Sequence, residues 1–234
     1  MSLIVISSRG GGLGDSVIAV NNACLLSKTN DNLLLVPHRK IFQNTHLRDG
    51  SERGKRGRRS IECFEFALSL FELGSLKVSM SEWGHKTKRV SKGPQSSYLE
   101  HAKPFVRHNQ ELILLDLCPC TWPFRPESIH PVRKKAEQLG EPVDLHRFAN
   151  EKGLTATVDL FLRARCFIGT CSGFAHVSHI FGVPCFMFLN GNRPRRLEEL
   201  HRHNQYTIVS SPDEIVIPSV PSGPNTIGLI TGSW

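Results

Sequence analysis

Short apolar runs separated by longer mixed segments set the pattern of this chain, and they predict strands alternating with helices. Residues 3–6 form a β-branched run typical of a buried parallel strand, and the largely apolar residues 17–26 predict a helix. A second apolar run at 33–36 ends at Pro37 and predicts another strand. Because a strand, a helix and a strand follow one another, we expect a right-handed crossover in a parallel sheet.

The second half of the chain repeats this order. A strand at 111–117 is followed by a helix at 130–139, and Gly140 ends that helix. Two such units, one in each half, predict an α/β fold with two facing Rossmann-like domains, each built on a parallel sheet. The remaining elements predicted in this half are a weak strand at 143–145, a helix at 155–165, a strand at 166–169, a tight turn at 170–173, a helix at 174–181 and a strand at 183–189.

We place the domain boundaries where the alternation of predicted strands and helices is interrupted. We expect an N-terminal Rossmann-like domain at residues 1–100, a C-terminal one at 105–211 and a Pro- and Gly-rich tail at 212–234. A linker rich in Lys, Arg, Gly and Ser spans about 84–104. Residues 48–60 hold six Lys or Arg against two acids, a composition that favours a solvated basic loop.

Charge and cysteine usage narrow the class of protein. The chain carries 29 Lys and Arg against 21 Asp and Glu, and its net charge of +8 favours an anionic partner such as nucleic acid, a phosphorylated glycan or a nucleotide. Its seven cysteines lie partly within apolar runs, which favours free thiols in a reducing compartment. No signal-peptide pattern and no apolar run of membrane-spanning length is present. We therefore expect a cytoplasmic protein without a transmembrane segment.

A glycine-rich turn at residues 10–14 separates the first strand from the first helix. Glycines let the backbone bend sharply and let a ligand approach closely, and the amides at the start of a helix suit an anion such as phosphate. The dinucleotide-binding fingerprint fails, because Asp15 stands where its third glycine would be, and the P-loop fails for lack of a Gly-Lys-Ser/Thr end. A nicotinamide or ATP site is therefore disfavoured, and an acid lies at the mouth of the turn.

Two motifs resemble one family of enzymes. Residues 9–19, Arg-Gly-Gly-Gly-Leu-Gly-Asp-Ser-Val-Ile-Ala, resemble the N-terminal motif of the heptosyltransferase-like GT-B glycosyltransferases of family 9. Residues 163–176, Arg-Ala-Arg-Cys-Phe-Ile-Gly-Thr-Cys-Ser-Gly-Phe-Ala-His, with Phe-Gly-Val-Pro at 181–184, resemble that family's C-terminal signature. The resemblance implies a compact GT-B-like fold, with acceptor binding by the N-terminal domain and donor binding by the C-terminal one. The family usually has Asp before Ser172, where this chain has Cys171.

The resemblance also implies the chemistry. The donor substrate is a nucleotide-diphosphate sugar, no metal or other cofactor is required, and Asp15 is the catalytic base that deprotonates the acceptor hydroxyl in an inverting transfer. Physical reasoning supports phosphate binding at the second turn, because a helix N-terminus offers amide donors where a leaving diphosphate gains charge. The residues expected to bind the donor and its phosphates are Gly12, Gly14, Arg125, Thr170, Cys171, Ser172, Gly173 and His176.

Structural explanations compete with these assignments. Asp15 is also a residue type that caps helix starts, and His176 is also typical of a buried structural histidine. His179, three residues beyond His176, suggests a metal pair but lacks a third ligand at suitable spacing, and Cys118 and Cys120 alone do not define a zinc site. Two other functions remain open: a DNA- or RNA-modifying glycosyltransferase of the same fold, and a non-catalytic module that binds nucleotide sugars or nucleic acid.

Overall fold

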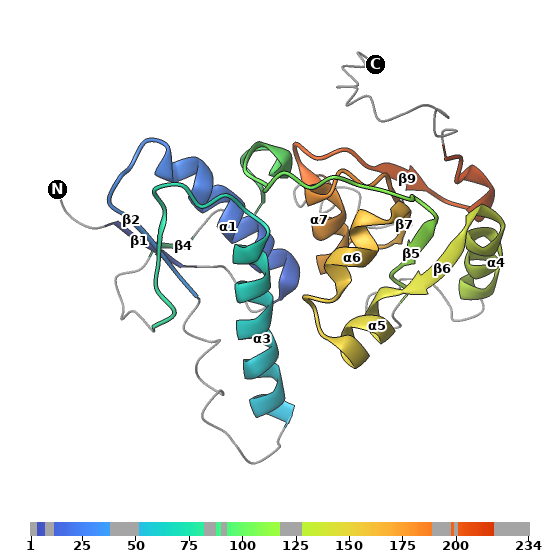
Figure 1. The fold of residues 1–234 in the computed structure, drawn as a ribbon, viewed down its shortest axis with the longest axis horizontal. Helices are drawn as coiled ribbons and strands as arrows, with labels where there is room; N and C mark the ends of the chain where they lie inside the picture. The colour runs from blue at the N-terminus through green and yellow to red at the C-terminus, as the bar shows by residue number, and fades with distance from the viewer. Residues whose placement is uncertain are drawn as a thin grey trace.

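Two parallel sheets flanked by helices form the molecule (Figure 1). The computed structural model describes residues 4–7, 12–37, 52–81, 88–89, 93–117, 128–188, 198 and 201–217. Every strand pair within both sheets is parallel. The predicted α/β class, with parallel sheets in both halves, is confirmed, whereas the domain boundaries proposed above stay predictions.

The first sheet has four strands in the order β3-β2-β1-β4. Helix α1 (Leu13–Ser27) connects β1 to β2, as the strand–helix–strand pattern predicts, and α3 (Glu52–Ser69) packs against α1. The strands are β1 (Ile4–Ser7), β2 (Leu33–Val36), β3 (Lys77–Val78) and β4 (Lys88–Arg89).

The second sheet has five strands in the order β6-β5-β7-β8-β9. Its central strands β5, β7 and β8 are buried along nearly their whole length, which is why they read as continuous apolar runs. The strands are β5 (Leu112–Leu115), β6 (Glu141–Asp144), β7 (Ala164–Gly169), β8 (Cys185–Phe188) and β9 (Thr207–Val209). The helices are α4 (Ile129–Leu139), α5 (Leu145–Lys152), α6 (Thr157–Leu162) and α7 (Gly173–Ile180).

A single hydrophobic core joins the two halves. One cluster contains Ile18 of α1 and Phe64 of α3 together with Phe167 of β7 and Ile180 of α7. Helices α1 and α7 lie side by side between the sheets (Figure 1) and form the main contact across the molecule. A second cluster, which includes Ile113, Ile168 and Val132 of α4, covers the other face of the second sheet. Burial of apolar area therefore holds the two sheets to one another as well as each sheet to its own helices.

Several sequence-based expectations are wrong. Residues 52–60, expected within a basic loop, form the first half of α3, because Lys, Arg and Glu are good helix formers and the amphipathic turn that follows extends the helix cooperatively. That helix ends at Ser69, and Phe71 forms an isolated antiparallel bridge with Ala102. Within the expected linker, Lys88 and Arg89 pair with β1 as a strand.

Two elements of the second half were not predicted. Helix α5 follows β6 directly, with Asp144 as its N-cap, and β9 forms an edge of the sheet. In the predicted tail, Pro212–Glu214 form a 3-10 helix, and the strand that the apolar residues 227–230 suggest lies outside the described residues. None of the helices described is both long and apolar enough to cross a membrane.

Candidate functional site

The first turns of α1 and α7 touch one another. A methyl group added at Gly173 would lie 2.7 Å from Leu13 Cβ and 3.1 Å from the Gly14 amide nitrogen. One added at Gly14 would lie 2.7 Å from His176 Cδ2. Both glycines are therefore required by the close approach of two helices. Because the first amides of a helix have no partner within it, two sets of such donors and two positive dipole ends converge at this contact.

Asp15 lies in the first turn of α1, at the edge of this contact, and its side chain is partly exposed. The N-cap of α1 is Gly12, and no side chain caps the helix there. The capping explanation for Asp15 is therefore wrong, because the residue lies three positions inside the helix. The neighbouring Ser16 hydroxyl is buried and, within the described residues, has no hydrogen-bond partner.

The second turn, residues 170–173, follows β7 and begins α7. Ser172 is the N-cap of α7, and its hydroxyl accepts a hydrogen bond from the Ala175 amide at 3.4 Å. The Thr170 hydroxyl is buried and without a partner among the described residues, and Cys171 is partly exposed. Ser172 therefore has a structural role of its own, which leaves the amides of Gly173 and Phe174 as the donors available to an anion.

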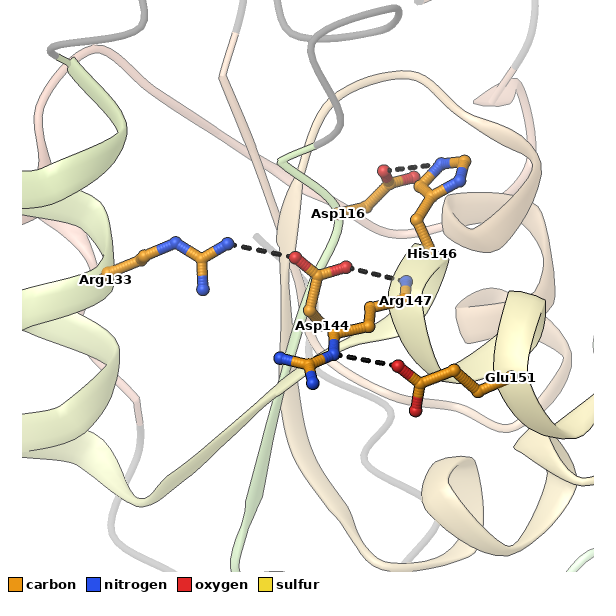
Figure 2. A network of polar contacts seen from close by, with 6 residues as sticks. All are labelled: Asp116, Arg133, Asp144, His146, Arg147 and Glu151. Atoms are coloured by element: carbon orange, nitrogen blue, oxygen red, sulfur yellow. Dashed lines mark hydrogen bonds and ion pairs between the residues drawn. The ribbon is translucent and has the colours of Figure 1, made fainter.

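Asp116 lies at the point where the strand order of the second sheet reverses. From β5 the chain passes to β6 on one side and later to β7 on the other, and ligands of such sheets bind outside the carboxyl ends of the strands at this point. Asp116 directly follows β5, and its Cβ would lie 3.0 Å from a methyl group at Gly169, the last residue of β7. Its carboxylate points toward His146 of α5 (Figure 2), whose Nε2 is 3.0 Å from Asp116 Oδ1.

A cluster of three buried histidines, His176, His179 and His201, lies behind the helix contact. His176 Nδ1 is 2.8 Å from the Tyr98 hydroxyl, and its ring stacks on that of His201 with centroids 4.4 Å apart. His201 Nδ1 is 2.9 Å from His179 Nε2, and His201 Nε2 is 3.3 Å from Cys171 Sγ. The histidine cluster therefore ties the segment before β5 and the segment before β9 to α7.

Burial lowers the pKa of all three histidines. The pKa of His176 falls to about 3 and that of His179 to about 4, and the pKa of His201 falls further because the other two rings add repulsion. The rings are therefore neutral near pH 7. His176, expected to contact the donor, is 3% exposed and packs on Gly14 and His201, which is the geometry of a structural histidine. Its contact with the donor stays a prediction.

The helix contact brings Gly14 directly against Gly173 and His176, three of the residues predicted for the site. Gly12, Gly14 and Asp15 lie on one side of the helix contact, and the 170–173 turn and His176 lie on the other. Arg125 lies outside the described residues. Sequence reasoning missed Asp116, although a charged residue inside the apolar run 112–117 was a usable signal, and it missed Tyr98 and His201, which have no local pattern.

Comparisons with known proteins place the fold. A bacterial iron-containing dodecameric glycosyltransferase, TibC from enterotoxigenic E. coli H10407, aligns with a TM-score of 0.52 and 13% identity over 89% of this chain and 65% of its own. The dodecameric iron-containing heptosyltransferase TibC in complex with ADP-D-β-D-heptose aligns with a TM-score of 0.52 and 12% identity, over 89% of this chain and 63% of its own. No protein-family model matches the chain, and neither does any curated protein. This chain spans less than two thirds of the length of those transferases, and at this identity the likeness shows a GT-B-like fold.

Proposed function

We propose that the protein is a GT-B-type glycosyltransferase that moves a sugar from a nucleotide-diphosphate sugar to an acceptor hydroxyl. The observation that carries this proposal is the contact between the first turns of α1 and α7, where Gly14, the residue before Asp15, lies against Gly173 of the turn proposed to bind phosphate. The glycosyltransferase fold of the similar structures, one of them solved with ADP-D-β-D-heptose, supports the same class of donor.

In this mechanism Asp15 accepts the proton of the acceptor hydroxyl while the hydroxyl oxygen attacks the anomeric carbon. The bond from that carbon to the diphosphate breaks, and the leaving group takes the electron pair. The amides at the starts of α1 and α7 stabilise the charge that develops on the diphosphate. Attack opposite the leaving group inverts the configuration of the anomeric carbon.

The sharpest test separates binding from turnover at Asp15. A panel of nucleotide sugars that includes ADP-D-β-D-heptose is screened by thermal shift, and donor turnover is then followed with and without acceptors. We expect Asp15→Asn to keep donor binding and to lose at least about a hundredfold in turnover, in the range typical of a lost general base. Asp31→Asn, a change at an exposed acid beyond the end of α1, is the matched control and keeps full activity. An Asp15→Asn enzyme with wild-type turnover would remove the mechanism.

The acceptor is proposed from charge. With a net charge of +8, the protein suits an anionic acceptor, either a phosphorylated glycan or a nucleic acid. Nucleic-acid binding would weaken steeply as salt is raised, and its absence at low salt would exclude the DNA- or RNA-modifying alternative. Donor binding without turnover on any acceptor would instead favour a non-catalytic nucleotide-sugar module.

Metal independence and location belong to the same proposal. Both similar glycosyltransferases contain iron, but within the described residues of this chain no three His, Cys, Asp or Glu side chains are arranged to hold a metal ion. We therefore propose that the transfer does not use iron, and we expect chelation with EDTA to leave turnover unchanged. None of the five cysteines described forms a disulfide, in keeping with the proposed cytoplasmic location.

A further inference from the structure

Asp116 is a buried carboxylate that lacks the hydrogen-bond donors such a group requires. Its side chain is fully buried, yet neither oxygen accepts a well-formed hydrogen bond from any residue described. His146 Nε2, at 3.0 Å from Oδ1, is at ion-pair distance without the direction of a hydrogen bond. An ionised carboxylate offers about four acceptor positions, so most of the acceptor capacity of Asp116 is unused. Buried polar groups are nearly always satisfied, and an exception calls for an absent partner.

The neighbouring acid shows what a satisfied carboxylate looks like in this sheet. Asp144 ends β6, the strand beside β5, and Figure 2 shows it held from two sides. One oxygen accepts a 2.9 Å hydrogen bond from Arg133 Nη2, and the other accepts one of 3.0 Å from the Arg147 amide. Two aspartates therefore stand at the carboxyl ends of adjacent strands. Each oxygen of the outer one accepts a hydrogen bond, and neither oxygen of the inner one accepts one from the described residues.

The surroundings of Asp116 favour a ligand with hydroxyl groups. The carboxylate repels phosphate, so an anion bound at the start of α7 does not supply its missing partner. Thr170, after β7, contributes a second buried hydroxyl without a described partner, close to the same strand end. His146 packs edge-on against Phe174 in the first turn of α7, which places the Asp116–His146 pair beside the turn that binds phosphate in the proposed function.

We propose that Asp116 is the residue that recognises hydroxyl groups of the donor, accepting hydrogen bonds from one or two neighbouring hydroxyls while the diphosphate lies over residues 172–174. His146 is its positioning residue. This inference rests on the proposed glycosyltransferase function and names the part of the donor that the second sheet reads. Hydroxyl groups that could donate to Asp116 are present in two parts of the donor, the ribose of the nucleotide and the transferred sugar.

The test is calorimetric titration of the full chain with ADP, 2′-deoxy-ADP and ADP-D-β-D-heptose. Asp116→Asn keeps the shape of the side chain and removes its charge. We expect it to weaken binding of the probe whose hydroxyl groups contact Asp116 by about tenfold or more, because hydrogen bonds to charged groups are the stronger ones. Asp144→Asn is the matched control, since Asn also caps helices, and it leaves affinity unchanged. If Asp116 binds the ribose, Asp116→Asn binds ADP more weakly than wild-type protein does and binds 2′-deoxy-ADP equally well. If Asp116 binds the transferred sugar, Asp116→Asn binds only ADP-D-β-D-heptose more weakly.

The outcomes separate the two proposals. If wild-type protein binds the probes and Asp116→Asn binds them equally well, the role of Asp116 is overturned while the proposed function stands. If wild-type protein binds neither these probes nor any other nucleotide sugar, the proposed function fails, and this inference fails with it. Unliganded thermal unfolding shows whether the variant is folded, and Asp116→Ser, smaller and also neutral, gives a second measurement of the same loss.

Discussion

At the scale of single residues, the glycines of the two motifs have different tasks although they are close in sequence. Gly14 and Gly173 make room for a helix contact, because any side chain there would overlap the facing helix. Among the described residues a methyl group at Gly12 would meet only Asp15 Oδ2, at an ordinary distance of 3.8 Å, and the φ of Gly12 is −85°, which any residue adopts. A glycine-rich turn that reads as one ligand-binding loop therefore contains a packing position.

This difference gives a paired prediction. Gly14→Ala places a methyl group 2.7 Å from His176 Cδ2, and because the ring is held between Tyr98 and His201 it cannot move aside. We expect a loss of about 1–3 kcal/mol in the free energy of unfolding, as for other overpacked cores. Gly12→Ala is the control in the same turn and changes stability by less than about 0.5 kcal/mol. Urea denaturation measures both, and equal effects would mean that the helix contact is looser than described.

At the scale of elements, α1 is hydrogen-bonded to residues 93–96, the segment that leads from the first half to the second. Asn22 is 1% exposed; its Nδ2 donates to the Gly93 carbonyl at 2.9 Å, and its Oδ1 accepts from the Gln95 amide at 2.8 Å. Asn21 donates to the Ser96 carbonyl at 3.2 Å. A few residues further on, the Tyr98 hydroxyl contacts His176 of α7. Two asparagines on a buried helix face thus anchor the route between the two sheets.

We expect Asn22→Ala to destabilise the protein by about 1–3 kcal/mol, because it removes two buried hydrogen bonds and leaves a backbone donor without its partner. It also exposes the Gln95 amide to faster hydrogen exchange. Asn30→Ala is the comparison, since Asn30 near the end of α1 donates to the local Leu26 carbonyl and bonds to no distant segment among the described residues. If the two variants lose the same stability and Gln95 exchange is unchanged, the anchoring role is refuted.

The elements also show what the sequence could and could not predict. Strands β2 and β5 were predictable because their apolar runs are buried on both faces, and α7 because Gly-rich turns bound it. The start of α3 was not, because charge density suggested a loop while helix propensity and the apolar turn after residue 60 decided the outcome. The histidine cluster was also out of reach, since His201 meets His179 through tertiary contacts that no local pattern encodes.

At the scale of the whole molecule, the two halves behave as one unit because they share a core and a buried polar cluster. The hydrophobic cluster that includes Ile18 and Ile180 crosses the boundary between the sheets. The histidine cluster lies against the same boundary, where the His176 ring faces Gly14 of α1. Any change that charges these rings therefore acts on the contact between the halves as well as on local packing.

That arrangement predicts an acid-sensitive fold. In the unfolded chain each histidine titrates near pH 6.5, whereas in the folded protein the pKa of His176 is about 3 and that of His179 about 4. Between about pH 6.5 and pH 4 the unfolded state thus binds more protons, so the stabilisation is complete above pH 6.5 and is lost as the pH falls. Each histidine contributes a slope of up to about 1.4 kcal/mol per pH unit.

Urea denaturation from pH 7.5 to pH 4.5 measures how the free energy of unfolding changes with pH. We expect His201→Gln to reduce that slope by the contribution of one histidine. His203→Asn, a change at an exposed histidine two residues away, leaves the slope as in the wild type. An unchanged slope in His201→Gln would mean that other groups cause the acid sensitivity.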